Sequence, residues 1–217
     1  MKRVTLFILS TLLLLSIFTA CIEHKKNPDE FNHAIENMAA KTISHTYEEF
    51  VMIYPDVEVT QHIDRKYANG NCLYTWAQDE LPPSTIVEYQ ETRFELYYTS
   101  DTWVPSEFET TLTPYHLNCN PSNYSVESIE QTADGYSVSC QIITKGTDFL
   151  EAYAEFVFDH NWNVLSYTTF TTYMTENYEG IEFQQSISNT VNFLLTSDEE
   201  IQQAIVDAFT EAQADCG

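Results

Sequence analysis

The stretch that decides the fold class is FLEAYAEFVFDHNWNVLSYTTFTTYM, residues 149–174. In its first part apolar and polar side chains alternate, which is the pattern of a strand with one buried face. The apolar row is Leu150, Ala152, Ala154, Phe156 and Phe158, and Glu151, Glu155 and Asp159 lie opposite it. Residues 159–163 have the composition of a turn, and the threonine- and tyrosine-rich segment 164–174 follows as a second strand. These residues predict an antiparallel β-hairpin.

The same period of two occurs on either side of this hairpin. In residues 135–143 the even positions are apolar and the odd ones are mostly polar, which predicts another half-buried strand. Further strands are expected around residues 57–63, 86–98, 108–112 and 181–195. The chain therefore contains enough strands for one large antiparallel sheet.

Segments whose apolar residues recur at helical spacing precede and follow the predicted strands. Asn27, Pro28 and Glu30 have the composition of a helix start, and Pro55 ends the pattern. The apolar residues between them recur mostly every three or four positions: Phe31, Ile35, Met38, Ala39, Ile43, Tyr47, Phe50 and Tyr54. Residues 197–200 repeat the capping pattern before Ile201, Ala204, Ile205, Ala208, Phe209 and Ala212. We predict a long N-terminal helix and a short C-terminal one, both facing the core.

The expected fold class is α+β, with a curved antiparallel sheet packed by the long N-terminal helix. Residues 28–217 are of a size usual for one domain, and no repeat or glycine- and serine-rich linker marks a second one. The 30 aromatic residues in the full chain, 14 Tyr, 13 Phe and 3 Trp, argue against disorder.

The charge excludes one class of partner. The chain has 33 acidic and 9 basic residues, a formal net charge of −24. Beyond Lys66 only Arg93 and Lys145 are basic. Nucleic acids and anionic lipid headgroups are bound by Lys and Arg, so we expect no nucleic-acid partner. The acidity fits solubility at a cell surface, or a surface that binds cations or a cationic partner.

The first 20 residues have the features of a secretory signal peptide. Lys2 and Arg3 precede the apolar segment 4–20, which is short for a permanent membrane span. The residues Phe18-Thr19-Ala20-Cys21 then resemble the lipobox of bacterial lipoproteins, with Phe18 in place of the commonest leucine. The resemblance implies that residues 1–20 are removed and that Cys21 is diacylated. Residues 21–27 would form a lipidated tether on the extracytoplasmic side of a bacterial membrane, in the cell envelope.

The five cysteines fit this interpretation, because four remain once Cys21 carries a lipid. They are Cys72, Cys119, Cys140 and Cys216. Exported cysteines often pair, and three connectivities are possible. We favour Cys119 with Cys140, which closes the shortest loop, and Cys72 with Cys216; the alternative is four free, buried thiols.

The sequence has no recognisable catalytic or cofactor motif. We therefore predict neither a cofactor nor a metal site, and we assign no catalytic residue. Asp159, Asn161 and Asn163 begin like an EF-hand loop, but the required glycine and glutamate are absent downstream. His45 with Glu49, and His116 with Cys119, are spaced like ligand pairs without a third member. With five glycines in the chain, a phosphate-binding loop is not expected.

The remaining candidate is the outer face of the hairpin at Glu151, Tyr153 and Glu155. A tight turn would place Thr172, Phe170 and Thr168 opposite these three residues in that order. Two hypotheses follow. The first is a lipid-anchored module that binds a small molecule or a protein partner without catalysis. The second is an exported hydrolase in which carboxylates such as Glu151 and Glu155 act on cell-envelope or glycan substrates.

Overall fold

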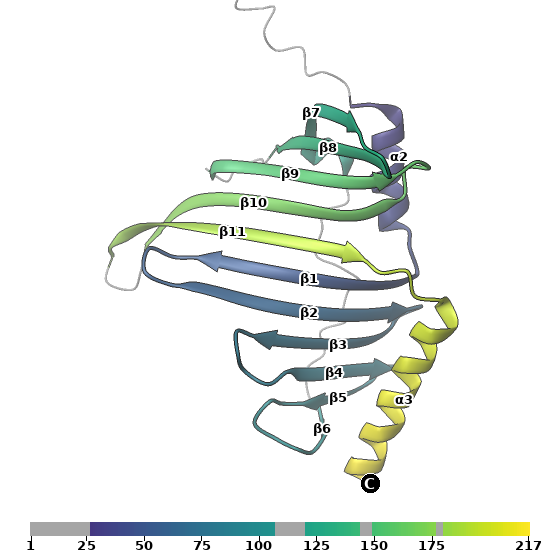
Figure 1. The fold of residues 1–217 in the computed structure, drawn as a ribbon. Helices are drawn as coiled ribbons and strands as arrows, with labels where there is room; N and C mark the ends of the chain where they lie inside the picture. The colour runs from purple at the N-terminus through teal and green to yellow at the C-terminus, as the bar shows by residue number, and fades with distance from the viewer. Residues whose placement is uncertain (1–26, 107–119, 144–148, 177–179) are drawn as a thin grey trace, which may run out of the picture.

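The computed structural model describes residues 27–106, 120–143, 149–176 and 180–217. Their main feature is an antiparallel sheet of eleven strands in the order β6-β5-β4-β3-β2-β1-β11-β10-β9-β8-β7, with helices α2 and α3 packed against it (Figure 1). The strands are β1 Ile43–Ile53, β2 Glu58–Ala68, β3 Asn71–Gln78, β4 Ser84–Tyr89, β5 Thr92–Leu96, β6 Val104–Pro105, β7 Tyr124–Gln131, β8 Gly135–Ile142, β9 Phe149–Asp159, β10 Val164–Glu176 and β11 Glu182–Phe193. Within the described ranges, no helix is long and apolar enough to cross a membrane.

The predicted hairpin is confirmed, and so are its register and the strand at 135–143. Tyr153 lies opposite Phe170, and Glu151 and Glu155 lie opposite Thr172 and Thr168. Leu150 was expected in the buried row but is 59% exposed, because the register of β9 and β10 shifts beside it. The strands predicted around 57–63 and 181–195 correspond to β2 and β11, whereas the single strand expected at 86–98 is wrong, because β4 and β5 form a hairpin there with a turn at Gln90 and Glu91. The strand expected at 108–112 lies outside the described residues.

The prediction of a long N-terminal helix is wrong. Helix α2 spans Asp29–Ala39 only, and the chain continues from residue 43 as strand β1. A spacing of four residues fits both a helix turn and two steps along a strand face, so Ile43 and Tyr47 match either pattern. Residues 42–53 are rich in β-branched and aromatic side chains, which favour the strand. Tyr47 was expected in the core but is 37% exposed.

The predicted start of this helix is also corrected. Pro28, not Asn27, occupies the N-cap position, and no side chain caps the helix. The Asn27 amide bonds the edge strand β7 instead. Its Nδ2 donates to the carbonyl of Tyr124 at 2.7 Å, and its Oδ1 accepts from the backbone N–H of Val126 at 2.9 Å. Asn27 therefore covers part of an otherwise unpaired strand edge.

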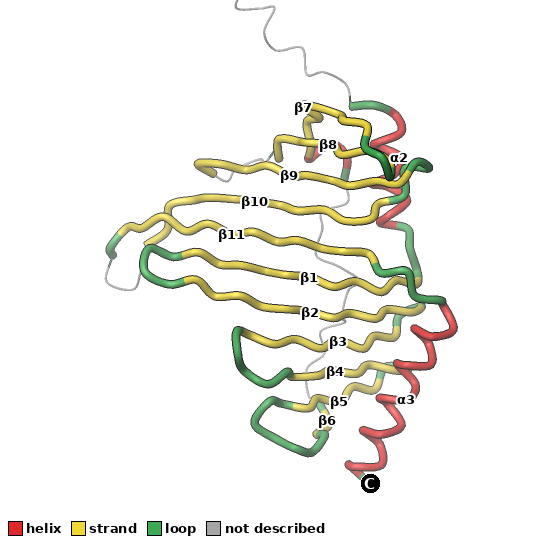
Figure 2. Tube along the Cα trace, viewed as in Figure 1, coloured by secondary structure: helices red, strands yellow, loops and turns green. Residues whose placement is uncertain are grey.

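Helix α3, Asp198–Cys216, begins as predicted, but with 19 residues it is longer than α2, so the prediction of a short C-terminal helix is wrong. Ser197 and Glu200 form a reciprocal capping box. Figure 2 shows that α2 and α3 lie at the same end of the strands. At this end β1 and β10 begin and β11 finishes.

The two helices pack on opposite faces of the sheet. Opposed residues of antiparallel strands point to the same face. One row of such opposed residues crosses the sheet from β10 to β3 in the order Tyr167, Val191, Glu48, Ile63 and Trp76. Leu73 is three residues before Trp76 in β3 and so points to the other face. Figure 1 shows α2 behind the sheet and α3 in front of it.

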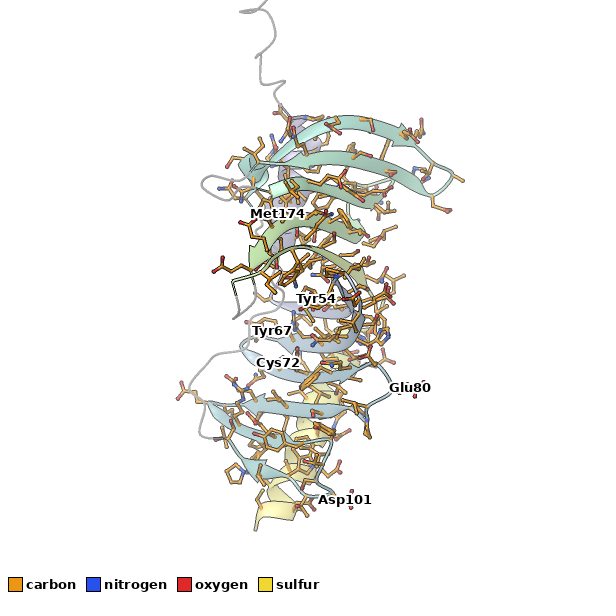
Figure 3. The ribbon with its side chains drawn as sticks, turned by 90° about the vertical axis from the view of Figure 1, so that its left-hand side faces the viewer. Tyr54, Tyr67, Cys72, Glu80, Asp101 and Met174 are labelled. Carbon is orange, nitrogen blue, oxygen red and sulfur yellow. The ribbon has the colours of Figure 1, made fainter. Side chains whose placement is uncertain are left out.

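Each face has its own apolar core. On the α2 face, Phe31, Ile35 and Met38 are almost fully buried against Phe156, Phe158 and Tyr167. On the α3 face, Ile201 and Ile205 pack with Val87 and Phe94. The α2 face also holds a buried ion pair, with Arg65 Nη2 3.4 Å from Glu48 Oε2 and both side chains 2% exposed. Figure 3 shows the sheet from the side, with side chains standing on both faces.

The predicted pairing of Cys72 with Cys216 is wrong. Cys72, Cys140 and Cys216 are free thiols in the structure, and Cys119 lies outside the described residues. Cys72 is adjacent to Leu73 in β3 and points to the α2 face, whereas Cys216 ends the helix on the α3 face. The sheet therefore separates them. Cys216 Sγ instead donates to the carbonyl of Trp103 at 3.2 Å. Burial raises the pKa of Cys72 and of Cys140 to about 12.

Candidate functional site

The sequence-predicted binding residues lie on a part of the α3 face that α3 does not cover. We call this part the open face. From β9 to β2 it consists of Glu151, Tyr153, Glu155, Thr168, Phe170, Thr172, Ser186, Ser188, Thr190, Tyr47, Glu49 and His62. Helix α3 packs on β1 to β4 and β6, near one end of the strands.

An aromatic pair forms one side of the open face. The rings of Tyr153 and Phe170 stack across β9 and β10 with centroids 5.0 Å apart and planes at 26°. The Tyr153 side chain is 45% exposed. Offset ring stacking stabilises a cross-strand pair, and the exposed ring surface is available to a ligand.

The two glutamates beside this pair are spaced more widely along the backbone than the carboxylates of a glycosidase pair. Glu151 and Glu155 are four residues apart in one strand, a backbone distance of roughly 13 Å. Paired glycosidase carboxylates lie about 5–9.5 Å apart. Tyr153 stands between them, and Glu155 accepts a hydrogen bond from the Ser137 hydroxyl at 3.0 Å. The geometry does not support the predicted role of these two residues as a hydrolytic pair.

A second ring pair lies on the other side of the open face. Tyr47 and His62 stack at 6.0 Å, and the Tyr47 hydroxyl is 3.0 Å from His62 Nδ1. Glu49 Oε2 lies 3.9 Å from the same nitrogen. This pair was not predicted, because Tyr47 was expected to lie in a helix. The β-branched and aromatic composition of residues 42–53 is the signal from which the strand could have been predicted.

Hydroxyl groups connect the two ring pairs. The side chains of Thr168 and Thr190 lie 3.1 Å apart, and those of Thr172 and Ser186 lie 2.9 Å apart. Each pair joins β10 to β11 by a cross-strand hydrogen bond. The open face thus has a row of half-buried hydroxyl groups at Thr168, Thr190 and Ser186, with Thr172 buried at 2% exposure, between two aromatic pairs. Its carboxylates are Glu49, Glu151 and Glu155.

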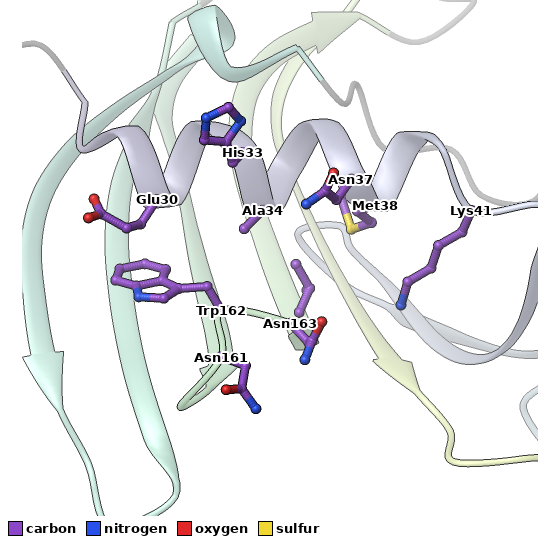
Figure 4. Close-up of a pocket in the computed structure, with 10 residues that line it drawn as sticks. Glu30, His33, Ala34, Asn37, Met38, Lys41, Asn161, Trp162 and Asn163 are labelled. Atoms are coloured by element: carbon purple, nitrogen blue, oxygen red, sulfur yellow. The ribbon is translucent and has the colours of Figure 1, made fainter.

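A groove lies at the end of the sheet where the helices begin and end. It consists of two adjacent cavities of about 260 and 550 Å³ that share Lys41, Asn163 and Val164. We call it the junction groove. Figure 4 shows the smaller cavity between α2 and the β9–β10 turn. Trp162 in this turn has φ 63°, a left-handed conformation held by its stacking on Tyr136 at 4.6 Å.

Lys41 is the cation of the junction groove. Its Nζ lies 4.9 Å from the centre of the Phe193 ring. Partial desolvation lowers the pKa of Lys41, and the nearby carboxylate of Asp159 opposes this shift. Asp159 itself is a turn residue, as predicted from its incomplete EF-hand pattern. Its Oδ1 accepts from the backbone N–H groups of Asn161 and Asn163, both at 2.8 Å.

The predicted ligand-like histidine pairs do not form a metal site in the described residues, where no group of three His, Cys, Asp or Glu side chains is placed to hold an ion. His45 and Glu49 share a face of β1 rather than of a helix. His116, like Cys119, lies outside the described residues.

Comparisons with known proteins give no family. No family model matches the chain, and no curated protein matches it significantly. Among solved structures it is similar to MucB in a complex with MucA(peri), with 14% identity and a TM-score of 0.36, covering 80% of this chain and 58% of MucB. The Pseudomonas aeruginosa MucA/MucB complex gives 14% identity, a TM-score of 0.35, and 80% and 59% coverage. A DUF1329 family protein from Desulfovibrio piger gives 7% identity, a TM-score of 0.30, and 76% and 89% coverage. The chain thus spans less than two thirds of the length of the matched chain in both MucA/MucB complexes.

Proposed function

We propose that the protein is a lipid-anchored extracytoplasmic module whose open face binds a basic segment of a partner protein. The observation that carries the proposal is a sheet surface that neither of the described α-helices covers, with two partly exposed ring pairs and three carboxylates. The rings are Tyr153–Phe170 and Tyr47–His62. Aromatic side chains are enriched at protein interfaces, where they bury large areas at low entropic cost.

Charge complementarity identifies the sign of the partner. The chain carries 33 acidic and 9 basic residues. On the open face, Glu49, Glu151 and Glu155 are opposed by no Lys or Arg among the residues that define it. Such a surface attracts Lys and Arg side chains and accelerates their approach at low salt. A cation can also lie over an exposed tyrosine ring. An anionic segment would be repelled.

The anchor is part of the proposal and rests on the lipobox resemblance at Cys21. Diacylation would hold the domain at a membrane despite the repulsion between its charge and anionic headgroups, because two acyl chains give stable anchoring. The test is detergent phase partition of wild type and Cys21→Ser expressed in a bacterium, with the mature N-terminus read by mass spectrometry. The proposal fails if wild type is unacylated or is cleaved at a position other than before Cys21.

Binding is tested with a synthetic octapeptide of alternating lysine and phenylalanine, measured by calorimetry against the purified protein at about 50 and 300 mM salt. We expect the double variant Tyr153→Ala, Phe170→Ala to weaken binding by about tenfold or more, consistent with loss of an aromatic anchor. We expect Glu151→Gln, Glu155→Gln to weaken binding at the lower salt concentration and to flatten its salt dependence.

Matched controls lie away from the open face. Tyr98→Ala removes an exposed ring, and Glu211→Gln removes an exposed charge on α3. Both should leave the affinity unchanged. Equal affinity for the glutamate–phenylalanine counterpart, or equal losses in the control variants, would contradict the assignment of the open face.

A further inference from the structure

A continuous hydrogen-bond relay begins in the wall of the junction groove, at Thr196 and His45. The Thr196 hydroxyl is 2.6 Å from His45 Nδ1. On the other side of the ring, His45 Nε2 is 3.1 Å from Asp64 Oδ2. The second oxygen of Asp64 accepts from Lys66 Nζ at 2.7 Å. The relay connects the β11–α3 linker to β1 and β2.

The partners of His45 determine how its protons are arranged. Partial burial acts to raise the pKa of Asp64, but hydrogen bonds from Lys66 and His45 outweigh it, and the net pKa is lowered. An ionised Asp64 only accepts hydrogen bonds, so Nε2 of His45 carries the proton. In the neutral ring Nδ1 then has a free lone pair, and the Thr196 hydroxyl donates to it. A hydroxyl, an imidazole and a carboxylate connected in this order form the arrangement that activates a nucleophile.

The relay has space for a substrate. His45 and Thr196 both line the larger cavity of the junction groove, about 550 Å³ in volume. Leu194 and Leu195 line the same cavity and are 41% and 101% exposed. These side chains offer an apolar surface beside the hydroxyl. A compound that presents a carbonyl to Thr196 and an alkyl group to the leucines would use both.

The start of α3 supplies backbone donors next to the hydroxyl. Thr196 immediately precedes the N-cap residue Ser197. The capping box uses the N–H groups of Ser197 and Glu200 but not those of Asp198 and Glu199. First-turn N–H groups have no acceptor within a helix and stabilise developing negative charge. The acidic side chains of this turn repel the negative charge that develops on the substrate, so we expect slow turnover.

We propose that Thr196 is a nucleophile, with His45 as its general base, in the hydrolysis of esters that carry an apolar acyl group. Thr196 Oγ1 attacks the ester carbonyl while its proton passes to His45 Nδ1. The carbon–oxygen bond to the alcohol breaks, and the alcohol leaves with that proton. Water then attacks the acyl-threonine ester, again with His45 as base, and releases the acid and free Thr196. Asp64 is a positioning residue that fixes the tautomer of His45.

Two measurements on the full-length protein in detergent test this activity. The first is covalent labelling by an alkyl fluorophosphonate, with the site identified by peptide mass spectrometry. The second is hydrolysis of p-nitrophenyl butyrate. We expect a single adduct on Thr196, and loss of adduct and turnover in Thr196→Val. Thr196→Ser should retain both, because it keeps the hydroxyl. Thr210→Val is the matched control, since the Thr210 hydroxyl donates to the Val206 carbonyl within α3.

The positioning role of Asp64 has a separate readout. Asp64→Asn should lower kcat by about 100-fold while KM stays within about twofold, because the base loses its orientation but the groove is unchanged. Absence of an adduct on Thr196, or undiminished labelling in Thr196→Val with an unchanged circular dichroism spectrum, overturns the inference. Peptide binding on the open face involves neither residue 196 nor residue 45, so either proposal can fail alone.

Discussion

The attachment of α2 to the sheet depends on Phe31, and replacing this residue tests the α2-face core. The Phe31 side chain has 0% exposure. Its ring contacts those of Phe156, Phe158 and Tyr124 edge-on, at centroid distances of 5.4, 6.1 and 6.4 Å. Phe31→Ala removes these contacts and leaves a cavity between a rigid sheet and a short helix.

The expected cost is about 3–5 kcal/mol in the free energy of unfolding, the range for truncating a buried phenylalanine. Three edge-on ring contacts place the estimate near the upper end, because such pairs add about 0.5–1.5 kcal/mol each beyond burial. With a urea dependence of about 2 kcal/mol/M, the unfolding midpoint should fall by roughly 2 M.

The assay is urea unfolding followed by far-ultraviolet circular dichroism, with Tyr98→Ala as the control for loss of an exposed ring. Tyr98 is 46% exposed, so its truncation should shift the midpoint by less than about 0.3 M. A midpoint shift below about 0.5 M for Phe31→Ala would refute the reasoning. It would mean that α2 does not contribute to the cooperative core.

Further predictions concern buried charge, pH and thiols. Glu48→Gln removes the negative charge 3.4 Å from the buried Arg65 guanidinium and should lower the unfolding free energy by about 3–5 kcal/mol. The apolar double variant Glu48→Leu, Arg65→Met should lose less stability, and calorimetric melting compares the two variants. Asp64 has a lowered folded-state pKa, so it stabilises the fold above its unfolded value of 3.8 and this stabilisation disappears as pH falls through the folded value. The difference in Tm between wild type and Asp64→Asn should therefore shrink from pH 6 to pH 3, and a constant difference would contradict it. Of Cys72, Cys140 and Cys216, only the exposed Cys216 should react with iodoacetamide in the native protein, and mass spectrometry that finds the other two labelled would show that their burial is wrong.

Short-range patterns in the sequence predicted the β9–β10 hairpin and the start of α3. The β9–β10 hairpin and the α3 capping box appear in the structure where alternation and capping residues placed them. These features depend on neighbours within a few residues, and the sequence displays such neighbours directly.

Strand β1 could not be predicted from such short-range patterns of polarity. Its buried positions include Ser44, Thr46 and Glu48, so polarity did not mark the buried row. Glu48 is buried because Arg65 on the neighbouring strand compensates its charge at 3.4 Å. A partner 17 residues away cannot be identified from local periodicity. The apolar spacing that remained suited a helix equally well.

The relay at His45 depends on a still longer connection. His45 and Thr196 are 151 residues apart, and they meet because β1 pairs with β11 in the middle of the sheet. The sequence shows a histidine near the start of one element and a threonine before a helix cap, each with an ordinary local explanation. Only the sheet order places the hydroxyl, the imidazole and the carboxylate in one line. The same pairing ends β11 beside the start of β1, and the chain must leave the sheet there to begin α3. The topology that assembles the relay therefore also places it beside the junction groove, where a substrate could reach it.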